Sequence, residues 1–390
     1  MKITRNVLLT AGFLLLAGLL IVAADKYYNL LFLFYPSLTR EIQGYLATWA
    51  AGFDFVVWQR MILIILGLIA VTLIICILRK KNILNWLFGW TAVAAVGIFL
   101  FMMVWGVNLY APGIADDMRL EVNDSYSSSE LQEAAEYYLA SANALAAEVD
   151  RDENGLCAIE SFDAAAANVG SGFHNMTRTC YVFGGSVEAP KPMAWSSLLR
   201  NADVTGMMVP FTGEATVNTE LLPVNIPFEM SRQAARRMSI ATIEDASFAA
   251  ILACMSSDDV TYQYAGYYMA YVYCYHALNN TNPAKVAQIT TNIGDGLKAD
   301  LIANGTLDGS APRGYMTLSG DELSSEARNT VADLLVAWHI RQTTPVVEED
   351  EGSTHGADVV PAPQDAIRQA AMTETETATE PSAEETSAEN

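Results

Sequence analysis

The chain has 390 residues, of which 52% are apolar, and a formal net charge of −22. This acidity argues against nucleic-acid binding, because contacts to phosphates need clustered Lys and Arg side chains. The length suffices for a membrane anchor and one soluble domain, and the long apolar runs lie near the N-terminus.

Three apolar runs in the N-terminal part are long enough to span a membrane. They are Val7–Ala24, Met61–Leu78 and Ile83–Leu109, so the predicted membrane anchor covers residues 1–110. The shorter apolar and aromatic stretch Asn29–Tyr35 is expected to pack at the interface or against the neighbouring helices.

The basic residues predict the orientation of the anchor. The turn Arg79-Lys80-Lys81 joins the second and third runs, and a short basic turn of this kind stays in the cytoplasm. Lys2 and Arg5 precede the first run, so the predicted path leaves everything after Tyr110 outside. The sequence therefore indicates a multi-pass protein of a bacterial cell membrane, with the lipid bilayer as one partner. In an alternative interpretation the first run is a cleaved signal peptide, and the orientation of the later part is then the same.

The predicted soluble domain, residues 111–342, is mainly helical with a small β element, which indicates an α+β layout. Ser129 and Gln132 form a capping-box pattern at the first helix. A short turn and helix follow at 191–201, and residues 207–218 are expected to be extended with a turn at Gly213. Further helices are predicted at about 227–238, 244–255, 261–278, 284–302 and 321–341.

The last segment, residues 343–390, is acidic and rich in Thr, Ser, Ala and Pro. It cannot bury enough apolar surface to offset the entropy of ordering, so it is predicted to be a disordered tail. Cysteine is sparse and lacks any CxxC spacing. Cys157 and Cys180 are candidates for a disulfide outside the cytosol, and the alternative is unpaired, mostly buried thiols.

One stretch carries a resemblance to a known family. The segment Pro210-Phe-Thr-Gly-Glu-Ala-Thr-Val-Asn218, followed by Pro227-Phe228 and a helix, resembles the domain-of-unknown-function 3810 (DUF3810) family. That family has N-terminal spanning helices and an extracytoplasmic zincin-like domain with a HELAH helix. The resemblance therefore implies a zincin-like fold, in which two His and a later carboxylate bind zinc and a Glu polarises the bound water.

The zinc-binding pattern is degenerate in this chain. An alignment through Pro227-Phe228 places Arg232 and Arg236 at the two His positions and Gln233 at the Glu. It places Ser239 at a Gly of the following turn, and Asp245 at the later acidic ligand. Arg has no lone pair for zinc and Gln is no general base, so the resemblance implies a lost catalytic site and no cofactor.

The same alignment leads to a structural hypothesis. Arg232, Arg236 and Asp245 would converge, and an ion pair would fill the place of the metal. The alternative is that Arg232, Arg236 and Arg237 form the solvated face of a surface helix.

Two further sets of residues are candidates for a site. Glu214 and Asn218 match the family segment. In one interpretation they line a peptide groove on an edge strand, and in the other they only fix the local turn. His276 is a candidate ligand, with Asp245 or Cys254, for a relocated metal site; the neighbouring tyrosines are expected to be core residues with hydroxyls at the rim.

The functional prediction is a membrane-anchored extracytoplasmic pseudopeptidase. It would bind a peptide, a wall component or an envelope protein without hydrolysis. The alternatives are an active zinc metallopeptidase with relocated ligands and a structural component of the envelope.

Overall fold

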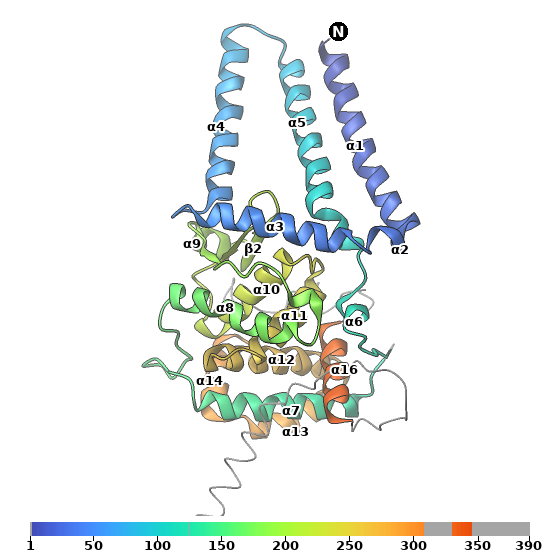
Figure 1. Cartoon of the computed structure of the whole chain (residues 1–390). Helices are drawn as coiled ribbons and strands as arrows, with labels where there is room; N and C mark the ends of the chain where they lie inside the picture. Colours follow the sequence, from blue (N-terminus) through green and yellow to red (C-terminus); the bar gives the residue numbers. More distant parts are fainter. Residues whose placement is uncertain (1, 124, 308–329, 345–390) are drawn as a thin grey trace, which may run out of the picture. The chain divides into compact units, whose positions relative to one another are not determined.

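The computed structural model describes residues 2–123, 125–307 and 330–344. Three of its helices are long and apolar enough to cross a membrane: α1 (Lys2–Lys26), α4 (Val57–Leu78) and α5 (Ile83–Val104). In Figure 1 they stand on one side of the helix α3 (Tyr35–Ala51), and the remaining elements lie on the other side. The predicted acidic tail lies outside the described residues.

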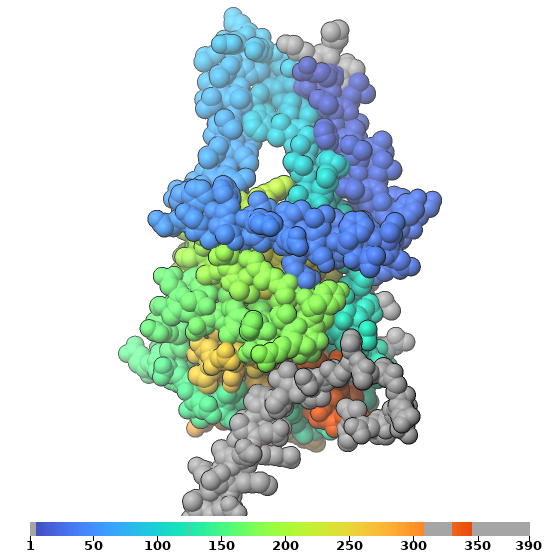
Figure 2. Space-filling view, viewed as in Figure 1, coloured from blue at the N-terminus to red at the C-terminus, as the bar shows by residue number. Residues whose placement is uncertain are grey.

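The spanning helices differ from the prediction mainly at the ends that meet the domain. α4 begins at Val57 rather than at residue 61. α5 ends at Val104 rather than at 109, because Trp105 leaves the helical conformation and residues Gly106–Tyr110 form a 3₁₀ helix. α1 packs along α5, with the rings of Phe13 and Phe99 5.7 Å apart. α4 diverges from α5 below their connecting turn, and Figure 2 shows an open gap between them.

The stretch predicted to pack at the interface is followed by a long helix. A short helix, α2 (Tyr28–Leu31), precedes α3, which crosses between the spanning helices and the rest of the protein (Figure 1). The small and polar face of α3, with Thr39 and Gln43, is buried against the domain. Its aromatic side chains Tyr45 and Trp49 are exposed, as is common for side chains at a membrane interface.

The domain is mostly helical with one small sheet. Its helices are α6 (Ile114–Asp117), α7 (Ser128–Ala146), α8 (Phe162–Thr177), α9 (Ser196–Arg200), α10 (Ile226–Arg237), α11 (Ile243–Met255), α12 (Val260–Thr281), α13 (Pro283–Ile289), α14 (Asp295–Ala303) and α16 (Val331–Thr343). Short 3₁₀ helices lie at Tyr181–Phe183, Pro223–Asn225 and Thr290–Asn292. Figure 1 shows α10, α11, α12 and α7 stacked in that order away from α3, and each contacts the next.

The sheet has three strands in the order β1-β3-β2. β1 (Lys191–Pro192) pairs parallel to β3 (Glu214–Val217), and β2 (Gly206–Val209) pairs antiparallel to it. The predicted turn at Gly213 is confirmed: its φ of +66° is a left-handed conformation that Gly adopts without strain. In the strand order given above, β3 is the central strand and β1 and β2 are the two edges.

Several helix boundaries predicted from the sequence are corrected. The first domain helix has its capping box at Ser127 and Glu130, because Glu130 rather than Gln132 returns a bond to the backbone of the cap. The helix expected at 284–302 is two helices, α13 and α14, with a break around Gly294. The last helix begins at Val331, and residues 308–329 lie outside the described part. The helix α8 was not predicted.

The core is built around α12, whose tyrosines are buried. The hydroxyl of Tyr262 donates to the carbonyl of Ala165, and that of Tyr264 donates to Asp300 Oδ2 at 2.6 Å. The tyrosines are therefore core residues as predicted, but these two hydroxyls end on buried partners rather than at the rim.

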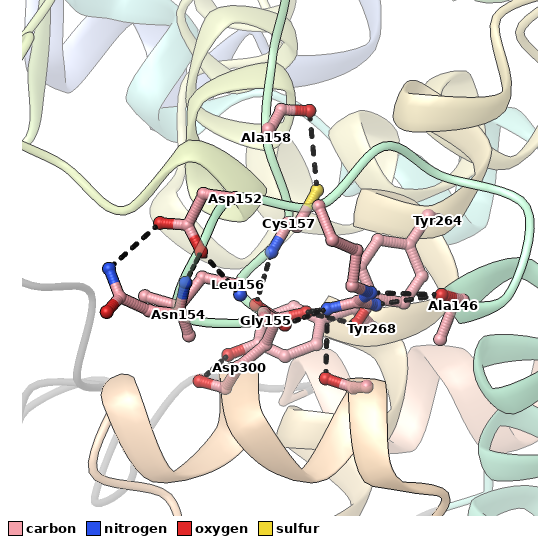
Figure 3. A network of polar contacts seen from close by, with 12 residues as sticks. Ala146, Asp152, Asn154, Gly155, Leu156, Cys157, Ala158, Tyr264, Tyr268 and Asp300 are labelled. Atoms are coloured by element: carbon pink, nitrogen blue, oxygen red, sulfur yellow. Dashed lines mark hydrogen bonds and ion pairs between the residues drawn. The ribbon is translucent and has the colours of Figure 1, made fainter.

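Asp300 is the centre of the polar network drawn in Figure 3. Its Oδ1 accepts the backbone N–H of Cys157 at 2.9 Å, and its Oδ2 pairs with Arg151 at 2.9 Å. Arg151 also donates to the carbonyls of Ala146 and Gly155. Both carboxylate oxygens are therefore satisfied, and the network ties α14 to the segment between α7 and α8.

All five cysteines are buried and unpaired. Cys157 lies in the Asp300 network and Cys180 lies near Asp117. The candidate disulfide between them is not formed, and the alternative of unpaired, buried thiols is confirmed.

Candidate functional site

The candidate site is organised by the helix α10. Pro227 stands in its first turn, where the missing N–H is no loss, and the helix ends at Arg237. Ser239 follows with a φ of +71°, a left-handed conformation that is unfavourable for a residue with a Cβ. This is the position at which the sequence alignment expects Gly, the residue that adopts this conformation without strain. The Ser239 hydroxyl is hydrogen bonded to that of Thr39 of α3, at 2.9 Å.

Arg232 and Gln233 are held by a buried carboxylate, Glu229, one turn earlier in α10. Arg232 Nη2 lies 2.7 Å from Glu229 Oε2, and Gln233 Nε2 donates to Glu229 Oε1 at 2.7 Å. Arg232 also donates to the hydroxyl of Thr205 at 3.0 Å, just before β2. Arg232 and Gln233, which the alignment places at the first His and at the Glu of the motif, are therefore both bound to a carboxylate on their own helix.

Arg236, which the sequence alignment places at the second His position, meets the end of α5, a candidate spanning helix. Its guanidinium lies over the indole of Trp105, 5.4 Å from the ring centroid. Its backbone carbonyl accepts the Trp105 Nε1–H at 2.9 Å. Trp105 also packs against Met208 of β2 and against Ala241. Burial, and then the neighbouring Arg232, lower the pKa of Arg236.

Arg237 is buried as well, and it donates to the carbonyls of Ser186 and Glu188 at 3.0 and 2.6 Å. Burial lowers its pKa to about 10, which still leaves it protonated at neutral pH. The interpretation of Arg232, Arg236 and Arg237 as a solvated face is therefore wrong, because the helix lies inside the protein rather than on its surface.

Asp245 lies at the start of α11 and faces α6 rather than α10. Its N–H is capped by Thr242 Oγ1 at 3.2 Å, and its carboxylate accepts the N–H of Ile114. Burial raises the pKa of Asp245, and these hydrogen bonds offset the effect only in part. Among the described residues no ion pair joins Asp245 to Arg232 or Arg236. The predicted pairing is wrong, because Glu229 is the carboxylate that Arg232 meets.

Asp245 lines a small cavity of about 180 Å³ between α3, α6 and the α10–α11 connection. Arg40, Asp117 and Tyr181 also line it. The Tyr181 hydroxyl donates to Asp117 at 3.0 Å, and Arg40 donates to the backbone carbonyl of Met238. Burial raises the pKa of Asp117, against the lowering effects of Tyr181 and Arg40.

Glu214 caps a spanning helix. Its two carboxylate oxygens accept the N–H groups of Val57 and Trp58, each at 2.9 Å, at the start of α4. Lys191 lies 3.1 Å from the same carboxylate and donates to backbone carbonyls at the end of α3 and in the following loop. The predicted groove position is thus a joint between β3 and α4, because β3 is the central strand and has no free edge.

Asn218 fixes a turn, as the second interpretation proposed. Its side chain donates to the carbonyls of Ser196 and Val204 and accepts the N–H of Glu220. It is fully buried, so it does not line a groove.

Neither His276 nor any other described residue takes part in a group of three or more His, Cys, Asp and Glu side chains that could hold a metal ion. His276 lies on α12 beside Tyr275, and burial lowers its pKa. Cys254 instead donates to the hydroxyl of Ser231.

Sequence reasoning missed Glu229, Trp105 and Lys191. The spacing of Glu229 from Arg232 and Gln233 is that of side-chain neighbours on a helix, so this contact was detectable in the sequence. The contacts of Trp105 and Lys191 join segments far apart in the chain, and no local pattern indicates them.

The comparison with known families gives one match. Residues 32–310 match the family model described as protein of unknown function (DUF3810). The match includes α3, α4, α5 and all the site residues above. No curated protein and no solved structure matches the chain.

Proposed function

Since the chain belongs to the DUF3810 family of proteins of unknown function, we propose that it is a membrane-anchored pseudopeptidase. In this proposal the domain has a zincin-like architecture, lies outside the cytoplasm of a bacterial cell, and binds its partner without hydrolysis. The partner would be an extended peptide, a wall component or an envelope protein.

The observation that carries the proposal is the state of the three α10 side chains at the motif positions. Arg232 and Gln233 are bound to Glu229, and Arg236 lies on Trp105. An arginine has no lone pair for a metal and Gln cannot take a proton from water, so these positions cannot perform zincin chemistry. Each side chain has a structural partner instead, as expected where contacts have replaced a catalytic site.

The arrangement of β2 and Trp105 supports binding that is linked to the membrane anchor. β2, rather than β3, is the edge strand beside α10, so an extended peptide would pair with it. Trp105 packs against Met208 of this strand and bonds to α10. A ligand at this edge therefore has to pack on Trp105 or displace it, and either change acts directly on the end of α5.

Zinc content tests the proposal. The full-length chain, purified in detergent and dialysed without chelator, is expected to hold far less than one zinc per chain. The triple variant Arg232→His/Gln233→Glu/Arg236→His restores the two His and the Glu of the motif helix, and zinc held by this variant would support the zincin-like architecture. Circular dichroism and the unfolding midpoint show whether this variant is folded.

One tightly held zinc in the unmodified chain would overturn the proposal and favour an active peptidase with relocated ligands. Loss of that zinc in His276→Ala would then identify a ligand. If neither peptides nor wall fragments bind the unmodified chain, a purely structural role in the envelope is the better description.

A further inference from the structure

A second site lies where α4 enters the domain, away from the motif helix. A cavity of about 830 Å³ opens there. One wall is the first part of α4, with Gln59, Arg60 and Leu63, and another is the preceding loop, with Phe53 and Phe55. The opposite wall is the β1 segment from 189 to 195. Since α4 is a candidate spanning helix, the cavity has a membrane-facing wall and a domain-facing wall.

The cavity contains a buried donor without a partner. The side chain of Gln59 is in a residue only 2% exposed, and its Oε1 accepts the N–H of Ala194 at 3.0 Å. Its Nε2 has no hydrogen-bond partner among the described residues. A buried N–H group without an acceptor is unfavourable. Gln59 therefore favours a ligand with an acceptor oxygen.

The strand that borders the cavity cannot add a peptide strand. The N–H of Met193 points inward to the carbonyl of Val217 in β3. The alternate residues, whose N–H groups would point outward, are Pro190 and Pro192, and the next donor, Ala194, is already bound by Gln59. Without outward N–H groups the edge is blocked for strand addition.

The charges around the cavity are of both signs. Arg60 is exposed, lies 5.6 Å from the ring centroid of Phe55 and forms no ion pair with another described residue. Lys191 is already held by Glu214. Three lining carboxylates, Asp54, Asp163 and Glu188, also form no ion pair within the described part of the chain.

We propose that this cavity binds a phospholipid with a phosphoethanolamine headgroup. The phosphate accepts from Gln59 Nε2 and pairs with Arg60, and the ammonium meets the lining carboxylates. The acyl chains run along the exposed apolar side of α4, beginning at Leu63. The site is independent of the proposed pseudopeptidase function, since it shares none of the motif residues.

Native mass spectrometry of the full-length chain in detergent tests this inference. With equal amounts of phosphatidylethanolamine and phosphatidylglycerol, the chain is expected to retain the first lipid selectively. Two variants should each weaken binding about tenfold or more. Arg60→Ala removes one charged contact. Gln59→Glu keeps the acceptor for the N–H of Ala194 but replaces the N–H₂ donor with a carboxylate oxygen. Arg79→Ala, at the other end of α4, is the matched control and should retain the lipid.

Two outcomes of the lipid measurement would overturn the inference, and a competition experiment adds a third. One is equal retention of both lipids. The other is equal loss of lipid in Arg60→Ala and Arg79→Ala, which would mean that the lipid binds through general charge near the spanning helices. Competition with soluble phosphoethanolamine shows whether the ligand is the whole lipid or only its headgroup. Failure of excess headgroup to displace the lipid supports a lipid site, and displacement at the same affinity refutes it.

Discussion

The joint between β3 and α4 can be tested by the substitution Glu214→Gln. In the native chain the Glu214 carboxylate accepts the N–H groups of Val57 and Trp58, each at 2.9 Å, and pairs with Lys191 at 3.1 Å. The side chain is only 2% exposed. Gln keeps the size and one acceptor oxygen, but it removes the charge and places an N–H₂ group against a backbone donor.

The expected loss is large because the site is buried. Breaking a buried ion pair from one side costs about 3–5 kcal/mol, and the remaining acceptor of Gln favours the lower end of this range. Lys191 keeps its three backbone carbonyl acceptors, which also limits the loss. A loss of about 3 kcal/mol lowers the unfolding midpoint by about 6–12 °C for a domain of this size.

The assay is thermal unfolding of the full-length chain in detergent, followed by hydrogen exchange of the first amides of α4. Glu220→Gln is the matched control, since Glu220 pairs with Arg200 at the same 3.1 Å but both side chains are partly exposed, at 39% and 35%. An exposed pair contributes less than about 1 kcal/mol. Equal shifts of the midpoint in the two variants, or unchanged exchange at Val57 and Trp58, would refute the joint.

Two other predictions concern Asp245 and the orientation of the chain. Burial raises the pKa of Asp245 above its usual 3.8, so the folded state favours the protonated acid. The resulting destabilisation is absent at low pH, develops as the pH rises from about 3.8 through the raised pKa, and then stays constant. Asp245→Asn should therefore raise the unfolding midpoint at about pH 8 and lose this advantage toward about pH 4; an advantage that is the same at both pH values would contradict the assignment. The orientation can be tested with alkaline phosphatase, which is active only outside the cytoplasm. A fusion after Thr343 should be active and a fusion after Lys81 inactive, and the reverse result would invert the proposed topology.

The three long apolar helices could be predicted from the sequence because length and apolarity alone identify such candidates for membrane spans. Their domain-facing ends could not be predicted, since these are set by residues far away in the chain. α4 starts where Glu214 supplies its cap, and α5 stops where Trp105 turns to bond the carbonyl of Arg236. A local pattern of apolar residues contains neither partner.

The helix α3 was missed for a related reason. A pattern search expects an amphipathic helix to bury its apolar side. α3 instead buries a face of mostly small and polar residues, where Gln43 donates to the carbonyl of Pro210 and Thr39 bonds to Ser239, and it exposes Tyr45 and Trp49. A local window of the sequence contains neither Pro210 nor Ser239, the residues against which this side of α3 is buried.

At the candidate site, the alignment put Arg232, Gln233 and Arg236 on one helix, as observed, but it gave Arg232 the wrong partner. Asp245 was chosen because it occupies a ligand position, and its carboxylate in fact meets the N–H of Ile114. Glu229 is closer along the helix, at a spacing that brings side chains together without any rearrangement. The nearer carboxylate therefore decides the geometry.

The contacts of the segment from α10 to Ser239 tie this helix to the N-terminal helices. Arg236 bonds to Trp105 at the end of α5, while the Met238 carbonyl accepts from Arg40 and Ser239 bonds to Thr39, both on α3. These contacts hold α10 against α3 and the end of α5 without any metal ion. Substitutions along it should therefore act first on the stability of this joint, and an effect on ligand binding would follow from the movement of Trp105.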